Sequence, residues 1–517
     1  MACGLAGGQH VSNHVESDRS SSSQTSSPVH CSSGAQSHHG PPPPVQHDPT
    51  SSPSPFDHDR GQCVENFGTV LGKIMSLYQN QDLSDIQIVV GHNVFHAHKL
   101  VLCCSSDVFR VMLMNPSWPE SSRHRIVLKE EPECIQVFED FLKYLYSGRI
   151  HLTHYTVLPM LMLADKYNIV DLQDVCQHYM CDHLVSTLQH NHAISWLQYG
   201  YVGGHRRLAT ACFQFVLWNF HKVSSTCDFL LAEKDVLIGF VHRSDLVVPD
   251  EYTLFKSVSR WIQYQSHRCG GCGSPTTNDG LRTAALDVLC NIRFPLIPPT
   301  HLSLVDADPV AREYPEFISQ RLDSAITFHR SSANDRRKIA GASGDDAVHY
   351  EPRNYTNEVW STTLSIENFS ALASHEVRPL FFSTPVSAAA ADEQLAWEWN
   401  VDLFPKGIHF QKCIMIGLWR NMEIAGAVYN TVRLVLATKT PERRNVEVAV
   451  LVTGVQDSVE FIKKVVEHRC MFDEEKRICH LNDIVPFDEL NCVNSPYLSG
   501  PDANTFKITI VIKPIAS

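Results

Sequence analysis

The sequence predicts a multidomain chain, in which an α+β domain, an all-α domain and an all-β sandwich follow an N-terminal tail. Two changes in the spacing of apolar residues predict this order. Strand and helix spacing alternate over 63–182, and helical spacing alone continues over 183–330. Over 351–517, short runs rich in Val, Ile, Thr and aromatic residues lie between turn residues. A length of 517 residues with 43 % hydrophobic residues allows about three packed cores.

Two segments have the composition of unstructured chain. Residues 1–62 are dominated by Ser, His, Pro, Gly and Gln and lack the apolar spacing that a core requires, so we expect a disordered tail. Its histidines have no scaffold to hold a metal, and we expect no metal site there. Residues 331–350 are polar and contain Gly, which indicates a linker.

Charge and composition narrow the classes of partner. The formal net charge is -13, with a pI near 6.1, which disfavours a nucleic acid as the main partner. We find neither a signal-peptide pattern at the start nor an apolar run long enough to cross a membrane. The odd total of 17 cysteines has no regular spacing, which indicates mostly reduced core residues. We therefore expect a cytoplasmic chain, with the nucleus as an alternative, and no membrane partner.

The α+β domain carries four separated motifs that resemble the BTB/POZ family. They are a strand start, a hairpin leading into a helix, a helix end, and a helix-turn-helix junction, at Leu83–Ile86, Phe95–Leu102, Tyr144–Gly148 and Ala164–Ile169. Their order matches the family's order. The resemblance implies the BTB fold for this domain.

The other two domains also resemble known families. The helical domain is similar to the BACK domain that follows BTB in adaptor proteins, through Cys212–Phe215, Ser244–Leu246 and Ile292–Leu296. The C-terminal domain resembles a divergent TRAF-like (MATH-like) sandwich, through Ile366–Ser370 and Leu403–Gly407. This order of domains resembles the BTB/POZ domain-containing protein 17 group.

The first ordered helix presents an apolar face. Its residues recur at three- and four-residue spacing and are Phe67, Val70, Leu71, Ile74 and Tyr78. BTB domains of this kind are homodimers whose first helices pack across the two-fold axis, so the resemblance implies that this face is a dimer interface. The alternative is that the face packs against its own domain.

A loop in the BTB-like domain fits the element by which the family's adaptors bind cullin-3. That element is a hydrophobic residue, any residue and a glutamate, and it is matched by Trp118, Pro119 and Glu120. A large aromatic side chain can anchor a desolvated pocket beside a directed carboxylate contact. The resemblance implies that the cullin-binding residues are Met112, Leu113, Trp118, Glu120 and Tyr146.

These resemblances imply a substrate-recognition adaptor of a cullin-3 RING E3 ubiquitin ligase. It would dimerise, dock cullin-3 through its BTB and BACK domains, and recruit an unknown protein substrate through its C-terminal domain. One alternative is a BTB scaffold or regulatory protein that engages no ligase. Another is a secreted BTB-BACK scaffold, which would use the glycosylation sequons at Asn354 and Asn368.

The sequence favours a protein that is not an enzyme and needs no cofactor. It contains neither a phosphate-binding GxxxxGK[ST] loop nor a GxSxG nucleophile elbow. Cys269 and Cys272 lie in a Gly-rich loop without a second cysteine pair, which disfavours a redox or zinc site. Asp85 and His98 lie at a strand start and a helix start, where we expect local polar contacts within a packed domain.

Overall fold

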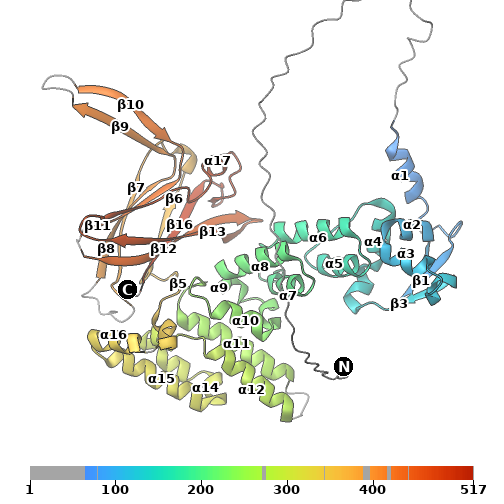
Figure 1. The fold of residues 1–517 in the computed structure, drawn as a ribbon, viewed down its shortest axis with the longest axis horizontal. Coiled ribbons are helices and arrows are strands. Elements are labelled where there is room, and N and C mark those ends of the chain that lie inside the picture. The colour runs from blue at the N-terminus through green and yellow to red at the C-terminus, as the bar shows by residue number, and fades with distance from the viewer. Residues whose placement is uncertain are drawn as a thin grey trace, which may run out of the picture. The chain divides into compact units, whose positions relative to one another are not determined.

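The computed structural model describes residues 65–78, 80–269, 275–342, 344–387, 396–415, 421–439 and 442–515 (Figure 1). The tail predicted over 1–62 lies outside the described residues, and so does Cys272 of the predicted Gly-rich loop. Among the helices that these ranges contain, none has the length and apolarity to cross a membrane.

The N-terminal domain is α+β, as its alternating periods predict. Its three-stranded sheet has the order β2-β1-β3, with strands β1 (Ile86–Val90), β2 (Asn93–Ala97) and β3 (Arg125–Leu128). Strand β1 pairs antiparallel with β2 and parallel with β3. The helices are α1 (Phe67–Met75), α2 (Lys99–Ser105), α3 (Asp107–Met114), α4 (Pro132–Ser147), α5 (Val157–Lys166) and α6 (Val170–Asp182), with a 3-10 turn η1 (Pro119–Ser122) after α3. Helix α4 ends at Gly148, whose left-handed φ of 61° lets its N–H bond to the Tyr144 carbonyl.

The middle domain is helical. Its elements are α7 (Ala193–Val202), α8 (Arg206–Trp218), α9 (Phe220–Val223), η2 (Asp228–Leu231), α10 (Lys234–Val241), α11 (Glu251–Cys269), α12 (Pro275–Leu289), η3 (Phe294–Leu296), α13 (Pro299–Asp306), α14 (Pro309–Glu313) and α15 (Pro315–Arg330). One short strand, β4 (Val247–Val248), interrupts them. The apolar stripes seen in the sequence pack into one core, which includes Trp196, Phe240 and Trp261.

The described residues of 331–350, the segment expected as a linker, are mostly helical. It forms α16 (Ala333–Ala342) and the 3-10 helix η4 (Gly344–Tyr350). Arg336 is 7 % exposed and donates to the carbonyls of Phe328 and His329 at the end of α15. A polar segment is therefore fixed because its arginine caps a neighbouring helix, which composition does not reveal.

The C-terminal domain is the predicted antiparallel sandwich. One sheet has the order β14-β11-β8-β7, and the other has the order β13-β12-β16-β15 with β6 also paired to β16. The strands are β5 (Asn354–Tyr355), β6 (Ser361–Ile366), β7 (Arg378–Pro385), β8 (Ala396–Phe404), β9 (Ile408–Met415), β10 (Asn421–Tyr429), β11 (Arg433–Thr438), β12 (Arg444–Gln456), β13 (Val459–Phe472), β14 (Ile478–Leu481), β15 (Leu498–Ser499) and β16 (Thr505–Pro514). Strands β9 and β10 form a separate hairpin, and the short helices are η5 (Phe369–Ala371) and α17 (Phe487–Leu490).

The central strand β12 is buried on both faces. Val446, Val448 and Val450 belong to the interior of the sandwich, whereas Ala449 and Leu451 join the core of the helical domain. This explains why β12 reads as a nearly continuous apolar run instead of an alternating one. The sandwich and the helical domain therefore share a hydrophobic core.

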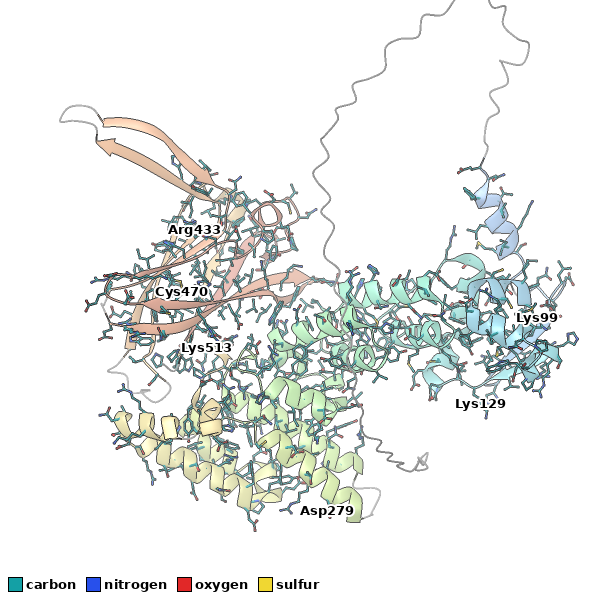
Figure 2. All side chains as sticks on the ribbon, viewed as in Figure 1. Lys99, Lys129, Asp279, Arg433, Cys470 and Lys513 are labelled. Atoms are coloured by element: carbon teal, nitrogen blue, oxygen red, sulfur yellow. A yellow bond between two sulfur atoms is a disulfide. The ribbon has the colours of Figure 1, made fainter. Side chains whose placement is uncertain are left out.

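A buried polar cluster reinforces this joint. Arg353 donates to the Glu251 carboxylate (Nε to Oε2, 3.0 Å), and both side chains are 0 % exposed. Tyr355 also donates to this carboxylate (2.5 Å), and the Arg293 amide donates to it from η3 (2.8 Å). Burial opposes ionisation of Glu251, but Arg353 and Arg293 hold its pKa below the usual value. Lys513 of β16 adds a bond to the Ser244 carbonyl (3.0 Å; Figure 2).

Candidate partner-binding surfaces of the α+β domain

Helix α1 is exposed along its whole length. Its apolar side chains Phe67, Val70, Leu71 and Ile74, here called the α1 apolar face, are 74 %, 56 %, 39 % and 38 % exposed. No residue of α1 is buried. A contiguous group of exposed apolar side chains on one helix is typical of a surface that a partner covers.

Tyr78, predicted with this face, packs within its own domain instead. Its ring lies 5.5 Å from that of Tyr146, and its hydroxyl donates to the Glu139 carbonyl (3.2 Å). The structure therefore places the five predicted dimer residues in two different environments. Four of them form an exposed face, while Tyr78 anchors the chain after α1 to α4.

Helix α3 is fixed from its first residue. Ser106 accepts a hydrogen bond from the Phe109 amide (3.0 Å) as an N-cap, and its hydroxyl donates to the Tyr167 carbonyl (2.5 Å). Phe109 and Leu113 face the core and are 0 % and 2 % exposed. The opposite side of the helix must therefore face outward.

The outward side of α3 continues into η1. Val108, Val111 and Met114 are 38 %, 49 % and 63 % exposed, and Trp118 beyond the helix is 47 % exposed. We define the α3–η1 surface as Val108, Val111, Met112, Met114, Trp118 and Glu120. Val108, Val111 and Met114 recur at three-residue spacing on α3 with Met112 beside them, and Glu120 is the second residue of η1.

Hydrogen bonds hold the backbone around Trp118 in place. The Trp118 amide donates to the Asn115 carbonyl (3.0 Å), and the Ser121 hydroxyl donates to the Trp118 carbonyl (2.8 Å). Lys99 of α2 donates to the Ser121 carbonyl (3.2 Å), which links η1 to α2 (Figure 2). The indole is thus presented on a short ordered turn, so little ordering entropy is lost when a partner covers it.

Two residues predicted to contact cullin-3 lie inside the domain. Leu113 and Tyr146 are each 2 % exposed. The Tyr146 hydroxyl accepts the His98 amide (3.0 Å), and burial raises the Tyr146 pKa despite that bond. In this geometry Leu113 and Tyr146 belong to the core beneath the surface. Val108, Val111 and Met114 lie on the surface instead.

Asp85 and His98 tie different segments of the domain together. Asp85 accepts the Lys99 amide (2.8 Å) at the start of α2, and His98 Nδ1 lies 3.0 Å from the Tyr146 hydroxyl. These are the local polar contacts expected at a strand start and a helix start.

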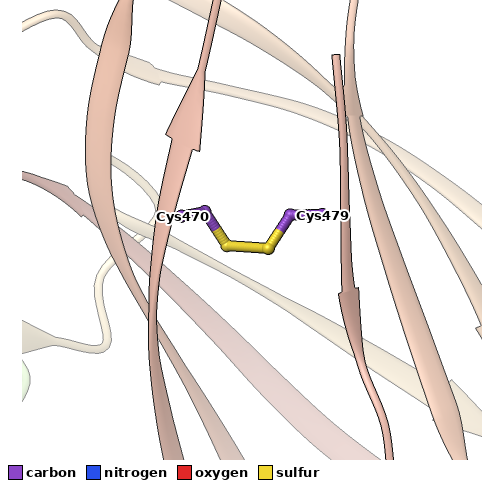
Figure 3. The surroundings of a disulfide bond; sticks show 2 residues. All are labelled: Cys470 and Cys479. Carbon is purple, nitrogen blue, oxygen red and sulfur yellow. A yellow bond between two sulfur atoms is a disulfide. The ribbon is translucent and has the colours of Figure 1, made fainter. Parts of the chain in front are cut away.

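The C-terminal domain contains a disulfide that the sequence did not predict. Cys470 of β13 and Cys479 of β14 are bonded (Figure 3). Because β13 and β14 belong to different sheets, the disulfide joins the two sheets of the sandwich. The irregular spacing of the cysteines gave no indication of this pair, because β13 and β14 come together only in the folded domain.

The two sequons differ in accessibility. Asn354 is 0 % exposed, and its amide donates to the Asp245 carbonyl (3.1 Å) and to Glu467 (2.9 Å). Asn368 and Ser370 are both exposed. Asn368 alone could accept a glycan in this folded state.

Family models match three parts of the chain. A BTB/POZ domain matches residues 74–184, a BTB And C-terminal Kelch (BACK) domain matches 193–305, and a BTBD17 TRAF domain matches 350–516. The resemblances stated from the motifs are confirmed, and the fold class of each domain agrees with them.

Relatives share this organisation at low identity. BTB/POZ domain-containing protein 17 of Xenopus laevis is 27 % identical over 66 % of this chain and 68 % of its own length. The human protein of that name is 28 % identical over 67 % of this chain and 68 % of its own. A galectin-3-binding protein of Mesocricetus auratus is 26 % identical over 59 % of this chain, which spans half of that relative.

Proposed function

We propose that this chain, which the BTB/POZ, BACK and BTBD17 TRAF domain models match, is a substrate-recognition adaptor of a cullin-3 RING E3 ubiquitin ligase. BTB and BACK domains together are typical of such adaptors, and proteins of this architecture are generally not catalytic. In this proposal the chain dimerises, binds cullin-3, and presents an unknown protein substrate through its C-terminal domain.

The observation that carries the proposal is the α3–η1 surface. It combines an exposed aromatic side chain, flanking apolar residues and a glutamate on a fixed turn. Central aromatic anchors supply much of the binding energy at protein interfaces, and a carboxylate at the rim adds orientation. The α1 apolar face supplies a second surface, suited to a symmetric contact between two copies.

Co-precipitation of cullin-3 tests this function. We expect the variant Trp118→Ala plus Glu120→Ala to lose cullin-3 binding by at least about 30-fold, because losing a central aromatic anchor costs about 2 kcal/mol or more. A control is Val202→Ala plus Glu358→Ala, which removes an exposed apolar residue and an exposed glutamate outside the α3–η1 surface.

Each outcome of this experiment has a distinct meaning. Equal capture by both variants would remove the α3–η1 surface from the mechanism. No capture of cullin-3 by any form of the folded chain would contradict the ligase function and favour a BTB scaffold that engages no ligase.

A secreted BTB-BACK scaffold is a second candidate, and the Cys470–Cys479 disulfide favours it. Disulfides persist mainly in oxidising compartments. In that case we expect a glycan on Asn368 and an unmodified Asn354, measured by mass spectrometry of the chain from its own cells with and without peptide-N-glycosidase. Free thiols at Cys470 and Cys479 together with an unmodified Asn368 would contradict secretion.

A further inference from the structure

An apolar cavity of about 370 Å³ lies where the connector after α6 meets α8, α9 and the start of β13. Its volume is at the lower end of the range of about 300–1,000 Å³ typical of small-molecule pockets, which are usually apolar with a few polar groups. The apolar lining comprises Val185, Leu188, Phe215, Val223, Val459 and Phe461. A ligand with an apolar body fits this lining.

Most polar groups of the cavity are already engaged. The Asn219 amide bonds to both the Ile462 carbonyl (3.1 Å) and the Ile462 amide (2.8 Å). Asn191 is held by Leu184 and Ala193 in the same way, through one donated and one accepted bond. Asn219 and Asn191 therefore form part of the cavity wall and have little remaining hydrogen-bonding capacity for a ligand.

Two polar groups keep binding capacity. The Ser186 hydroxyl is buried and has no hydrogen-bond partner among the described residues. The Lys222 ammonium donates to the Glu460 carbonyl but retains further N–H groups. Lys222 is an exposed residue that lines the cavity, and partial desolvation lowers its pKa.

The local charge at this end of the cavity is positive. Lys507 pairs with the Glu460 carboxylate (3.3 Å), whereas Lys222 donates to the Glu460 backbone carbonyl. Lys222 and Lys507 against Glu460 leave one net positive charge. An anionic group would offset that charge and satisfy the Ser186 hydroxyl.

We propose that this cavity binds a small amphipathic carboxylate of the medium-chain fatty acid class. Its apolar chain lies against Val185, Phe215 and Phe461, and its carboxylate bonds to the Lys222 ammonium and the Ser186 hydroxyl. The bound ligand contacts the connector, the helical domain and the sandwich together. Binding would therefore stabilise their arrangement. This inference does not depend on the cullin-3 function.

Calorimetric titration of the full chain with decanoate tests the proposal. We expect decanoate to bind the wild type and to bind Lys222→Met at least about tenfold more weakly, which corresponds to about 1.4 kcal/mol. Decanol, which has the same chain but no charge, should bind the wild type with a similar loss. Lys439→Met, an exposed lysine of the sandwich, is the matched control and should bind like the wild type.

A cavity-filling variant locates the site. Leu188 is 55 % exposed, so Leu188→Trp places bulk at the cavity without burying new polar groups, and it should abolish decanoate binding. The folding of each variant is checked by circular dichroism. Absence of decanoate binding to the wild type, or equal binding to wild type and Lys222→Met, would overturn the proposal. Unchanged binding by folded Leu188→Trp would place the ligand elsewhere and also overturn it.

Discussion

The BTB domain and the joint between the BACK and TRAF domains use charged and apolar residues in opposite ways. The joint buries Glu251 and Arg353 completely, and each group there has several partners. The BTB domain leaves Phe67, Val70 and Trp118 74 %, 56 % and 47 % exposed. The buried polar groups of the joint bond to one another, so the joint needs no second chain. A surface that exposes large apolar side chains gains stability only when a partner covers it.

We expect the largest effect from a variant that breaks the buried Glu251–Arg353 pair at the joint. Glu251→Gln removes the charge that compensates Arg353 and Arg293, and breaking a buried pair in this way costs about 3–5 kcal/mol. We expect a correspondingly lower midpoint of urea unfolding for the BACK and TRAF domains.

Glu376→Gln is the matched control for Glu251→Gln. It breaks the exposed pair between Glu376 and Arg378 (2.8 Å), and exposed pairs contribute about 1 kcal/mol or less. Similar midpoints for the two variants would mean that the buried cluster does not hold the joint.

The next effect concerns the exposed apolar face. We expect Leu71→Asp plus Ile74→Asp to weaken self-association by at least about 30-fold, because charges would be buried without partners at a symmetric interface. Sedimentation measures this change. Both side chains are more than a third exposed, so the unfolding midpoint of the monomer should stay near that of the wild type. A wild type that sediments as a monomer at all concentrations would contradict the dimer.

We expect the smallest effect from the titration of His154, which lies where the BTB and BACK domains meet. His154 stacks on Trp196 and has His183, His190 and His192 around it, with Asp457 as the opposing charge. Burial first, and then these histidines, lower the His154 pKa below its usual value near 6.5. The folded chain therefore binds this proton less readily than the unfolded chain does.

The sign of the resulting pH dependence follows from that difference. The contribution of His154 to stability is fully present above about pH 6.5 and is lost as the pH falls toward the lowered folded value. We expect the unfolding midpoint to decline in this window, and to decline less in His154→Phe. An equal decline in both proteins would assign the effect to other groups.

Local patterns made much of the fold predictable. Helical spacing gave the apolar face of α1, and the motif around Tyr144 and Gly148 marked the end of α4. Strand spacing also predicted the sandwich. In each case the signal is carried by residues that are neighbours in sequence.

The rest depends on how the folded elements pack against one another. Nothing near Cys470 indicates that Cys479 will lie beside it, and the sequon at Asn354 does not reveal that Asp245 and Glu467 enclose it. The resemblance places Tyr146 among the cullin-binding residues, although its side chain is 2 % exposed and contacts His98 and Tyr78. Burial of a polar or aromatic side chain is set by its tertiary neighbours, which a single sequence does not show.

The buried cluster around Glu251 and Arg353 has a consequence for how the protein is made. Glu251 leaves the ribosome about one hundred residues before Arg353 and Tyr355, which complete its cluster. During that interval the BACK helices hold a carboxylate that lacks two of its partners. Domains generally fold in the order in which they leave the ribosome. The BACK domain, however, is complete only once the first residues of the TRAF domain have been made. A released chain ending at residue 340 should therefore be more easily proteolysed than a released chain ending at residue 360, even though both contain every predicted helix of the domain.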